Sequence, residues 1–200
     1  MIVADFRLII LIMKFYQIPI ICVLLCMMSS HSLWSQNLTY NDFMRVSKIK
    51  NWSDINDDLS LKGYAYGGSK SDTIKTMVTW HRNCNDFRIK YDWDTEWNYD
   101  TGTAYSILLI YDYKYLVLGD FINNDYRFFE YYLNSKSSFN NFKSSAKQNG
   151  FKFLKDIVDD NNITSIYERK KQNTNEVLHL ISRRTGGYII KYWPTYRTSN

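Results

Sequence analysis

A helix-and-glycine pattern occurs twice in the sequence, at an offset of 87 residues. In each copy, apolar residues three or four positions apart lead to a glycine, Gly63 or Gly150, which stands where the C-terminal cap of a helix belongs. We therefore predict an internal duplication, with copies at about 39–135 and 136–197. The offset aligns Trp52 with Phe139, Ile55 with Phe142, Leu59 with Ala146, Tyr64 with Phe151, Tyr66 with Phe153, Trp80 with Tyr167 and Arg82 with Arg169.

In each copy the sequence predicts a helical segment that is followed by strands. Before Gly63 we expect two short helices, the first capped by Thr39 or Asn41 and the second starting near Ser53; before Gly150 we expect one. Aromatic residues make up 17% of the chain and favour half-buried sheet surfaces. We expect an α+β fold, in which an antiparallel, aromatic-rich sheet is built from two tandem αβββ units with helices packed on one face.

Residues 87–100 alternate strictly between apolar and aromatic side chains at odd positions and charged or amide side chains at even ones, with Thr95 among the odd set. This period of two predicts a single strand with two different faces. Turn residues at 100–102 and the apolar run at 105–119 predict a returning strand. In that hairpin Trp97 would lie near Tyr105, and Trp93 near Leu109.

The acidic residues of this strand allow three interpretations. A calcium loop would need a glycine and a bidentate glutamate where the chain has Trp97 and Thr103, and alternate strand residues lie ~6.6 Å apart, too far for five to meet at one ion. We therefore expect no metal site. A solvated strand face and a sugar-binding strip both remain open. The ligand-binding residues of such a strip would be Trp93, Trp97, Tyr99, Asp94 and Glu96.

Residues 1–35 have the pattern of a secretory signal peptide, and Met13 is a candidate for the true start. Lys14 precedes an apolar run at 18–28, and a small, polar end follows. We expect export to the periplasm, the outer envelope or the medium, with residues 36–200 as a single domain. An uncleaved signal anchor is the alternative and would be the only membrane contact. Cys84 is the one cysteine beyond this segment, so an internal disulfide is excluded.

No arrangement typical of catalysis stands out. His81 and Cys84 suggest a Cys–His nucleophile, but no oxyanion loop or orienting third residue is recognisable. The carboxylate pairs Asp57–Asp58, Asp94–Glu96 and Asp159–Asp160 would need to face each other across a cleft to act as a glycosidase. We expect no cofactor. With 25 basic and 20 acidic residues, the mild positive charge also argues against nucleic acid as a partner.

Several short motifs follow one another along the chain: Ser35-Gln36-Asn37, Leu38–Asp42, Leu61–Tyr64 and Phe139–Phe153. In these the chain resembles small exported proteins of Bacteroidetes bacteria, although Leu61 replaces a usual lysine and the 92–120 segment is long. The resemblance implies an exported location and this architecture, and no activity. The expected architecture is also similar to the tandem repeats of β-lactamase-inhibitor-like domains, which hold a partner on a concave sheet.

From these observations we expect an exported, non-enzymatic binding module whose partner is a protein or an envelope glycan. Two alternatives stay open. One is a small secreted hydrolase that uses Asp94, Glu96 or the His81–Cys84 pair. The other is a structural envelope protein without a soluble ligand.

Overall fold

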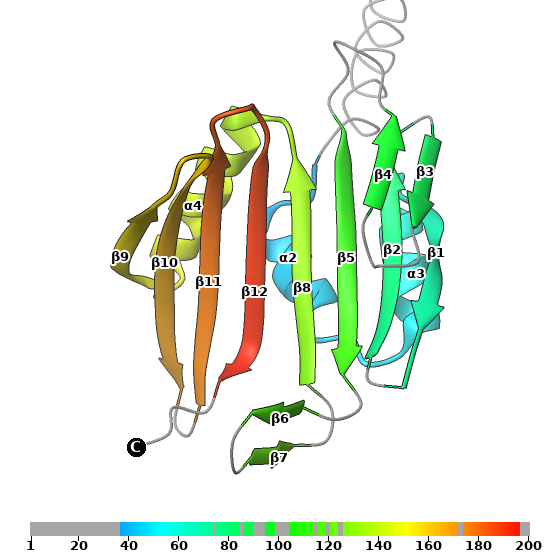
Figure 1. The fold of residues 1–200 in the computed structure, drawn as a ribbon, viewed down its shortest axis with the longest axis horizontal. Helices are drawn as coiled ribbons and strands as arrows, with labels where there is room; N and C mark the ends of the chain where they lie inside the picture. Colours follow the sequence, from blue (N-terminus) through cyan, green and yellow to red (C-terminus); the bar gives the residue numbers. More distant parts are fainter. Residues whose placement is uncertain are drawn as a thin grey trace, which may run out of the picture. The chain divides into compact units, whose positions relative to one another are not determined.

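The computed structural model of the chain describes residues 37–73, 75–84, 86–89, 95–98, 105–113, 116–118, 121–123, 126–171 and 174–196, which belong to one compact unit, Asn37–Asn200 (Figure 1). The helices are α2 (Tyr40–Val46), α3 (Trp52–Ser60) and α4 (Lys136–Gln148). The strands are β1 (Ala65–Ser71), β2 (Lys75–Arg82), β3 (Asp86–Ile89), β4 (Thr95–Asn98), β5 (Ser106–Tyr113), β6 (Leu116–Leu118), β7 (Phe121–Asn123), β8 (Tyr126–Leu133), β9 (Lys152–Val158), β10 (Asn162–Lys171), β11 (Thr174–Arg183) and β12 (Tyr188–Tyr196).

The main sheet is antiparallel and has eight strands in the order β1-β2-β5-β8-β12-β11-β10-β9 (Figure 1). Within the described residues, the pairs β3-β4 and β6-β7 form two separate hairpins. The predicted α+β class with an antiparallel, aromatic-rich sheet is therefore confirmed. The strand count differs from our expectation, because four strands of the main sheet follow α3 and four follow α4, where we expected three.

The larger hydrophobic cluster joins the helices to the sheet. It contains Phe43 of α2, Ile55 of α3 and Phe142 of α4, together with sheet residues such as Trp80 and Tyr131. Phe43 is fully buried and makes ring contacts with Phe129, Tyr131, Phe142 and Tyr192 at centroid distances of 5.4–6.1 Å. Alternate residues of β2 and β5, namely Met77, Ile107 and Leu109, form a second cluster with Tyr105, because successive strand residues point to opposite faces.

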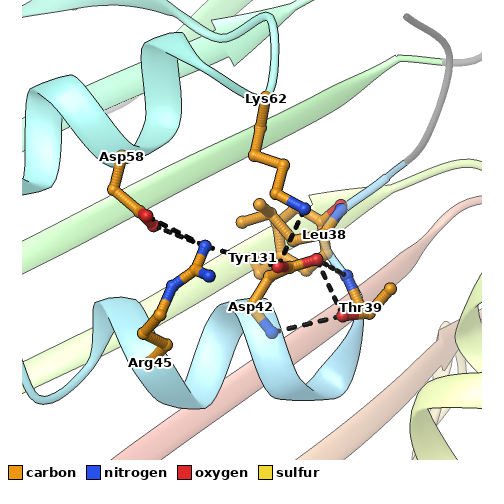
Figure 2. A network of polar contacts seen from close by, with 7 residues as sticks. All are labelled: Leu38, Thr39, Asp42, Arg45, Asp58, Lys62 and Tyr131. Carbon is orange, nitrogen blue, oxygen red and sulfur yellow. Dashed lines mark hydrogen bonds and ion pairs between the residues drawn. The ribbon is translucent and has the colours of Figure 1, made fainter. Parts of the chain in front are cut away.

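The start of α2 is fixed by a capping box. The Thr39 hydroxyl accepts a hydrogen bond from the Asp42 backbone N–H, while the Asp42 carboxylate accepts one from the Thr39 N–H at 3.1 Å (Figure 2). The preceding residue, Leu38, donates its backbone N–H to the Tyr131 hydroxyl at 2.9 Å, which attaches the chain before α2 to β8. Both contacts satisfy groups that a buried helix start would otherwise leave unpaired.

Two ion pairs join α2 to α3 and the turn after it. Lys62 Nζ lies 2.9 Å from the carboxylate of the buried Asp42, and Arg45 lies 2.9 Å from that of Asp58 (Figure 2). Burial alone would raise the pKa of Asp42, but hydrogen bonds from Thr39 and Lys62 lower it below its ordinary value. These contacts hold α2 and α3 together and thereby place the loop between them.

The predicted helix ends are confirmed at both glycines. Gly63 and Gly150 have φ of +78° and +89°, a conformation that favours glycine. After each helix an N–H five residues downstream closes the last turn: Tyr64 N donates to Leu59 O at 3.0 Å, and Phe151 N donates to Ala146 O at 3.1 Å.

The single strand predicted for 87–100 is wrong. The chain reverses within it, so that β3 and β4 form a hairpin in which Phe87 pairs with Trp97 and Arg88 with Glu96. The predicted pairing with 105–119 is also wrong, because β5 pairs with β2 and β8. Alternation is equally compatible with one long strand and with two short strands joined by a turn, since the same residues share a face in both.

Candidate functional site

The predicted sugar-binding strip lies mostly outside the described residues. Trp97 and Glu96 belong to β4, where the backbone places them opposite Phe87 and Arg88. Trp93, Asp94 and Tyr99 fall outside the described part of the chain. The strip therefore stays a prediction.

A groove with aromatic walls lies between α3 and the edge of the main sheet formed by β1 and β2. Its first pocket has a volume of about 500 Å³ and is lined by Trp52, Ser53, Asn56, Tyr66, Ser69, Thr76, Val78 and Trp80. Its lining combines aromatic rings with small hydroxyl and amide side chains and includes no acidic or basic residue. Such a surface suits a ligand that has apolar faces and many neutral polar groups.

A second pocket continues the groove, because Trp52 and Thr76 line both. Its volume is about 660 Å³, and its remaining lining residues are Ser47, Lys48, Ile49, Lys50, Asp112, Tyr113 and Arg127. Lys48 and Lys50 are exposed and have no ion-pair partner within the part of the chain that the structure describes. Among the described residues, this end of the groove therefore carries positive charge that no carboxylate compensates.

Trp52 lies where the two pockets meet, and its ring is fixed by two neighbours. The Arg127 guanidinium carbon lies 4.6 Å from the ring centroid, and the Trp80 ring is stacked at 6.1 Å. Arg127 is itself held by two hydrogen bonds to the Asp112 carboxylate, at 2.5 and 2.7 Å, and donates to Ile49 O at 2.6 Å. The loop between α2 and α3 is thereby attached to β5 and β8.

Tyr66 offers the most accessible ring of the groove. It is 53% exposed, and its ring makes an edge contact with Trp80 at 6.0 Å. A β-bulge between Tyr66 and Gly68 shifts the register of β1 against β2 at this point, and bulges often redirect a side chain at a sheet edge. Gly68 has φ of +118°, which other residues rarely adopt.

Polar groups of the first pocket are held by partners. The Trp80 indole N–H donates to Asn56 Oδ1 at 3.2 Å, which leaves the Asn56 amide nitrogen available as a donor. The hydroxyls of Ser71 and Thr76 lie 2.9 Å apart. The groove thus presents oriented hydrogen-bonding groups beside its rings.

The Cys–His nucleophile gains no support from the environment of the two residues. Burial raises the pKa of the Cys84 thiol to about 11, so it is protonated at neutral pH, and its Sγ lies 3.7 Å from the Arg82 carbonyl oxygen. Burial also lowers the pKa of His81, which disfavours an imidazolium that could stabilise a thiolate.

The described carboxylate pairs have local structural contacts. Asp58 pairs with Arg45, and Asp159 accepts hydrogen bonds from the N–H groups of Asn161 and Asn162 in the β9–β10 turn. No group of three His, Cys, Asp or Glu side chains that could hold a metal ion occurs in the described ranges. In the same ranges no helix is long and apolar enough to cross a membrane.

Sequence reasoning missed this groove. It assigned Trp52, Tyr66 and Trp80 to the repeated helix-and-strand pattern, but nothing in their spacing indicated that α3 and the β1–β2 hairpin leave a space between them.

No protein-family model, curated protein or solved structure matches the chain.

Proposed function

We propose that the protein is an exported, non-enzymatic binding module and that its ligand is an envelope glycan held in the groove between α3 and β1–β2. The observation that carries this proposal is the aromatic pocket of Trp52, Tyr66 and Trp80, which adjoins the cationic pocket of Lys48 and Lys50. The signal-peptide pattern of residues 13–35 supports export.

The chemistry of a sugar fits the first pocket. One face of a pyranose ring presents C–H groups, which pack on an aromatic ring, while its edge presents hydroxyls. The Tyr66 ring provides the packing surface, and Ser53, Asn56, Ser69 and Thr76 provide hydrogen-bonding groups around it. The two pocket volumes, about 500 and 660 Å³, lie in the range of about 300–1,000 Å³ that is common for small-ligand sites.

The second pocket favours an acidic substituent on this glycan. A sugar carboxylate or phosphate next to the ring at Tyr66 would lie near Lys48 and Lys50, and charge-assisted hydrogen bonds to lysine are stronger than neutral ones. Arg127 contributes less, because Asp112 already compensates its charge.

The test compares Tyr66→Ala with Phe153→Ala by calorimetry and thermal unfolding against neutral and acidic oligosaccharides. Phe153 is a matched control, because it is 51% exposed and its ring makes an edge contact with Tyr167 at 5.6 Å, much as Tyr66 does with Trp80. We expect Tyr66→Ala to weaken binding at least tenfold, about 1.4 kcal/mol, and Phe153→Ala to leave it unchanged. Absence of binding to every oligosaccharide, or equal losses in both variants, would contradict the proposal.

The acidic preference has its own test. Replacing Lys48 and Lys50 together by glutamine should abolish discrimination between acidic and neutral forms of the same sugar and should leave binding of the neutral form intact. Unchanged discrimination in the double variant would place the charge recognition elsewhere.

We further infer that the domain consists of two tandem units, each built on one helix, α3 or α4, and the four strands of the main sheet that follow it. The last strands of the two units, β8 and β12, pair in the middle of the sheet. Residues that correspond at the offset of 87 make equivalent contacts in the two units, which supports this inference. A Cβ added to Gly63 would lie 3.7 Å from Arg82 Cδ, and one added to Gly150 would lie 3.7 Å from Arg169 Cδ. Arg82 and Arg169 in turn lie over the rings of Tyr64 and Phe151.

The edge hairpins add independent support. Tyr66 pairs with Trp80, and Phe153 pairs with Tyr167. Each edge strand has a register shift directly after this aromatic residue: after Tyr66 in β1, and after Phe153 in β9, opposite Ile166–Tyr167 of β10.

We also infer that all three helices cover one face of the sheet. The buried residues of α3 and α4 and four buried apolar residues of α2 share a single cluster, and the helices lie behind the main sheet in Figure 1.

A further inference from the structure

Exposed apolar side chains are concentrated at one edge of the main sheet. Of the seven large apolar side chains that the structure describes as exposed, five lie on the β9–β10 hairpin. They are Phe153, Leu154, Ile157, Val158 and Ile163. Among the described strands β9 pairs only with β10, and all seven residues of β9 are exposed. An edge strand with apolar side chains and open backbone groups is a template for pairing with another strand.

We propose that this edge is the interface of a homodimer, in which β9 pairs antiparallel with β9 of a second copy and Ile157 lies opposite Ile157 of the partner subunit. The two eight-stranded sheets would then form one continuous sheet. This inference is independent of the glycan groove, which lies at the opposite edge of the sheet, near β1.

Symmetry limits the possible registers. Two copies that meet at the same edge are related by a twofold axis perpendicular to the sheet. One residue of each copy then lies opposite the same residue of the partner subunit, and this residue defines the register. Lys155 opposite itself would bring two lysines together, and Asp156 opposite itself would bring two carboxylates together. Val158 opposite itself would place Asp156 against Asp160 of the partner subunit. Like charges directly opposite each other are destabilising.

The register centred on Ile157 has complementary charges. It places Lys155 opposite Asp159 of the partner subunit, and the symmetry repeats this pair on the other side of the axis. It also places Asp156 opposite Val158 of the partner subunit, so no like charges face each other. The centre itself is an apolar Ile–Ile contact.

The backbone pattern of β9 agrees with this register. Asp159 N–H donates to Asn162 O at 3.1 Å, and hydrogen-bonded pairs alternate along an antiparallel ladder. Ile157 therefore directs its backbone groups toward β10, whereas Asp156 and Val158 direct theirs outward. In the proposed register Asp156 and Val158 of the partner subunit are directly opposite, and both have outward groups to exchange.

The register shift opposite Ile166–Tyr167 limits the regular part of the new ladder to residues after Leu154. The contact would involve about five residues of each copy, with Ile163 of β10 packing beside Val158. The other edge of the sheet lacks this pattern, because β1 carries Gly67, Gly68, Ser69, Lys70 and Ser71 at the equivalent positions.

Cysteine cross-linking tests both the interface and its register. In a full-length chain whose native cysteines, Cys22, Cys26 and Cys84, are replaced by serine, we would compare Ile157→Cys with two controls under a glutathione redox buffer. The controls are Asp156→Cys, one position away, and Lys70→Cys, which lies 87 residues earlier on the other edge strand. Opposed residues at a non-hydrogen-bonded pair have Cα atoms about 4.5 Å apart, within the range that a disulfide spans.

We expect Ile157→Cys to form mostly disulfide dimer and both controls to remain mostly monomer. Sedimentation of the cysteine-free chain should show a reversible dimer, which Ile157→Lys abolishes while the unfolding transition is retained, because Ile157 is 46% exposed. A cysteine-free chain that stays monomeric up to several hundred micromolar would overturn the dimer. Equal cross-linking through Asp156→Cys would overturn the proposed register.

Discussion

The regions α3-β1-β2 and α4-β9-β10 each consist of a helix followed by an edge hairpin of the main sheet. They differ in how the buried polar side chains next to the helix and hairpin are paired. In the first, the Tyr64 hydroxyl lies 2.6 Å from Ser106 Oγ and 3.0 Å from the Tyr131 hydroxyl. The three hydroxyls are uncharged, and the buried Arg82, which lies opposite Ser106, donates to Asn37 Oδ1 at 3.1 Å. Burial raises the pKa of both tyrosines, so their hydroxyls stay protonated and serve as donors.

In the second region a carboxylate, that of Glu176, lies opposite the corresponding arginine, Arg169. Glu176 is 2% exposed and accepts hydrogen bonds from Arg169 at 2.5 Å, Lys171 at 2.6 Å and the Tyr192 hydroxyl at 2.8 Å. Burial alone would raise the pKa of Glu176, but these donors lower it below its ordinary value. Ser106 and Glu176 occupy corresponding sheet positions, opposite Arg82 and Arg169 respectively.

The same backbone arrangement thus accommodates either uncharged hydroxyls or a buried carboxylate, and the two should differ in how much stability is lost when a member is removed. A neutral hydroxyl network loses one hydrogen bond when a member is removed. A buried carboxylate between two cations leaves uncompensated charge when it is removed. The two regions should therefore respond very differently to equivalent substitutions.

The largest effect is expected from Glu176→Gln. Arg169 and Lys171 would lose their shared carboxylate, and we expect the free energy of unfolding to fall by about 3 kcal/mol, measured by urea denaturation at neutral pH. A loss no larger than that of a surface substitution would show that the network contributes little.

The pH dependence of this loss provides a control. The pKa of Glu176 is lowered in the folded state, so its stabilisation is fully present above the unfolded-state pKa of about 4.3 and is lost as pH falls through the lower folded-state pKa. The difference in stability between the native chain and Glu176→Gln should therefore shrink in acid. A difference that stays constant with pH would exclude the carboxylate charge as its cause.

Intermediate and equal effects are expected from Gly63→Ala and Gly150→Ala. Both glycines have positive φ, and both face an arginine Cδ at 3.7 Å from the added Cβ position, so each substitution should cost about 1–2 kcal/mol of backbone strain. Chemical denaturation of the two variants measures both costs. Clearly unequal costs would break the proposed equivalence of the two units.

The smallest effect is expected from Ser106→Ala. The Tyr64 and Tyr131 hydroxyls would keep their mutual contact, and Tyr131 would still accept from Leu38 N–H. We expect a loss of about 1 kcal/mol in the same urea assay, which is well below that of Glu176→Gln. A loss as large as that of Glu176→Gln would remove the contrast between the two networks.

Helix positions and ends were predictable from the sequence because their signals are local. Thr39 caps α2, and the glycines at 63 and 150 end α3 and α4, since capping and left-handed backbone depend on neighbouring residues. The strand at 87–100 was mispredicted because alternation specifies faces and leaves open where the chain turns. The groove was not predictable, since its walls come from α3, the α2–α3 loop and four strands, β1, β2, β5 and β8.

Residue types and their spacing were enough to predict the α+β class, the helix ends and the repeated pattern at an offset of 87. They did not predict the strand order, the pairing of β8 with β12 or the exposure of β9 at one edge, which the three-dimensional structure shows. Propensity and capping act over a few residues, whereas strand pairing joins segments far apart in the chain, such as 126–133 and 188–196. Such long-range pairing depends on the packing of the whole sheet.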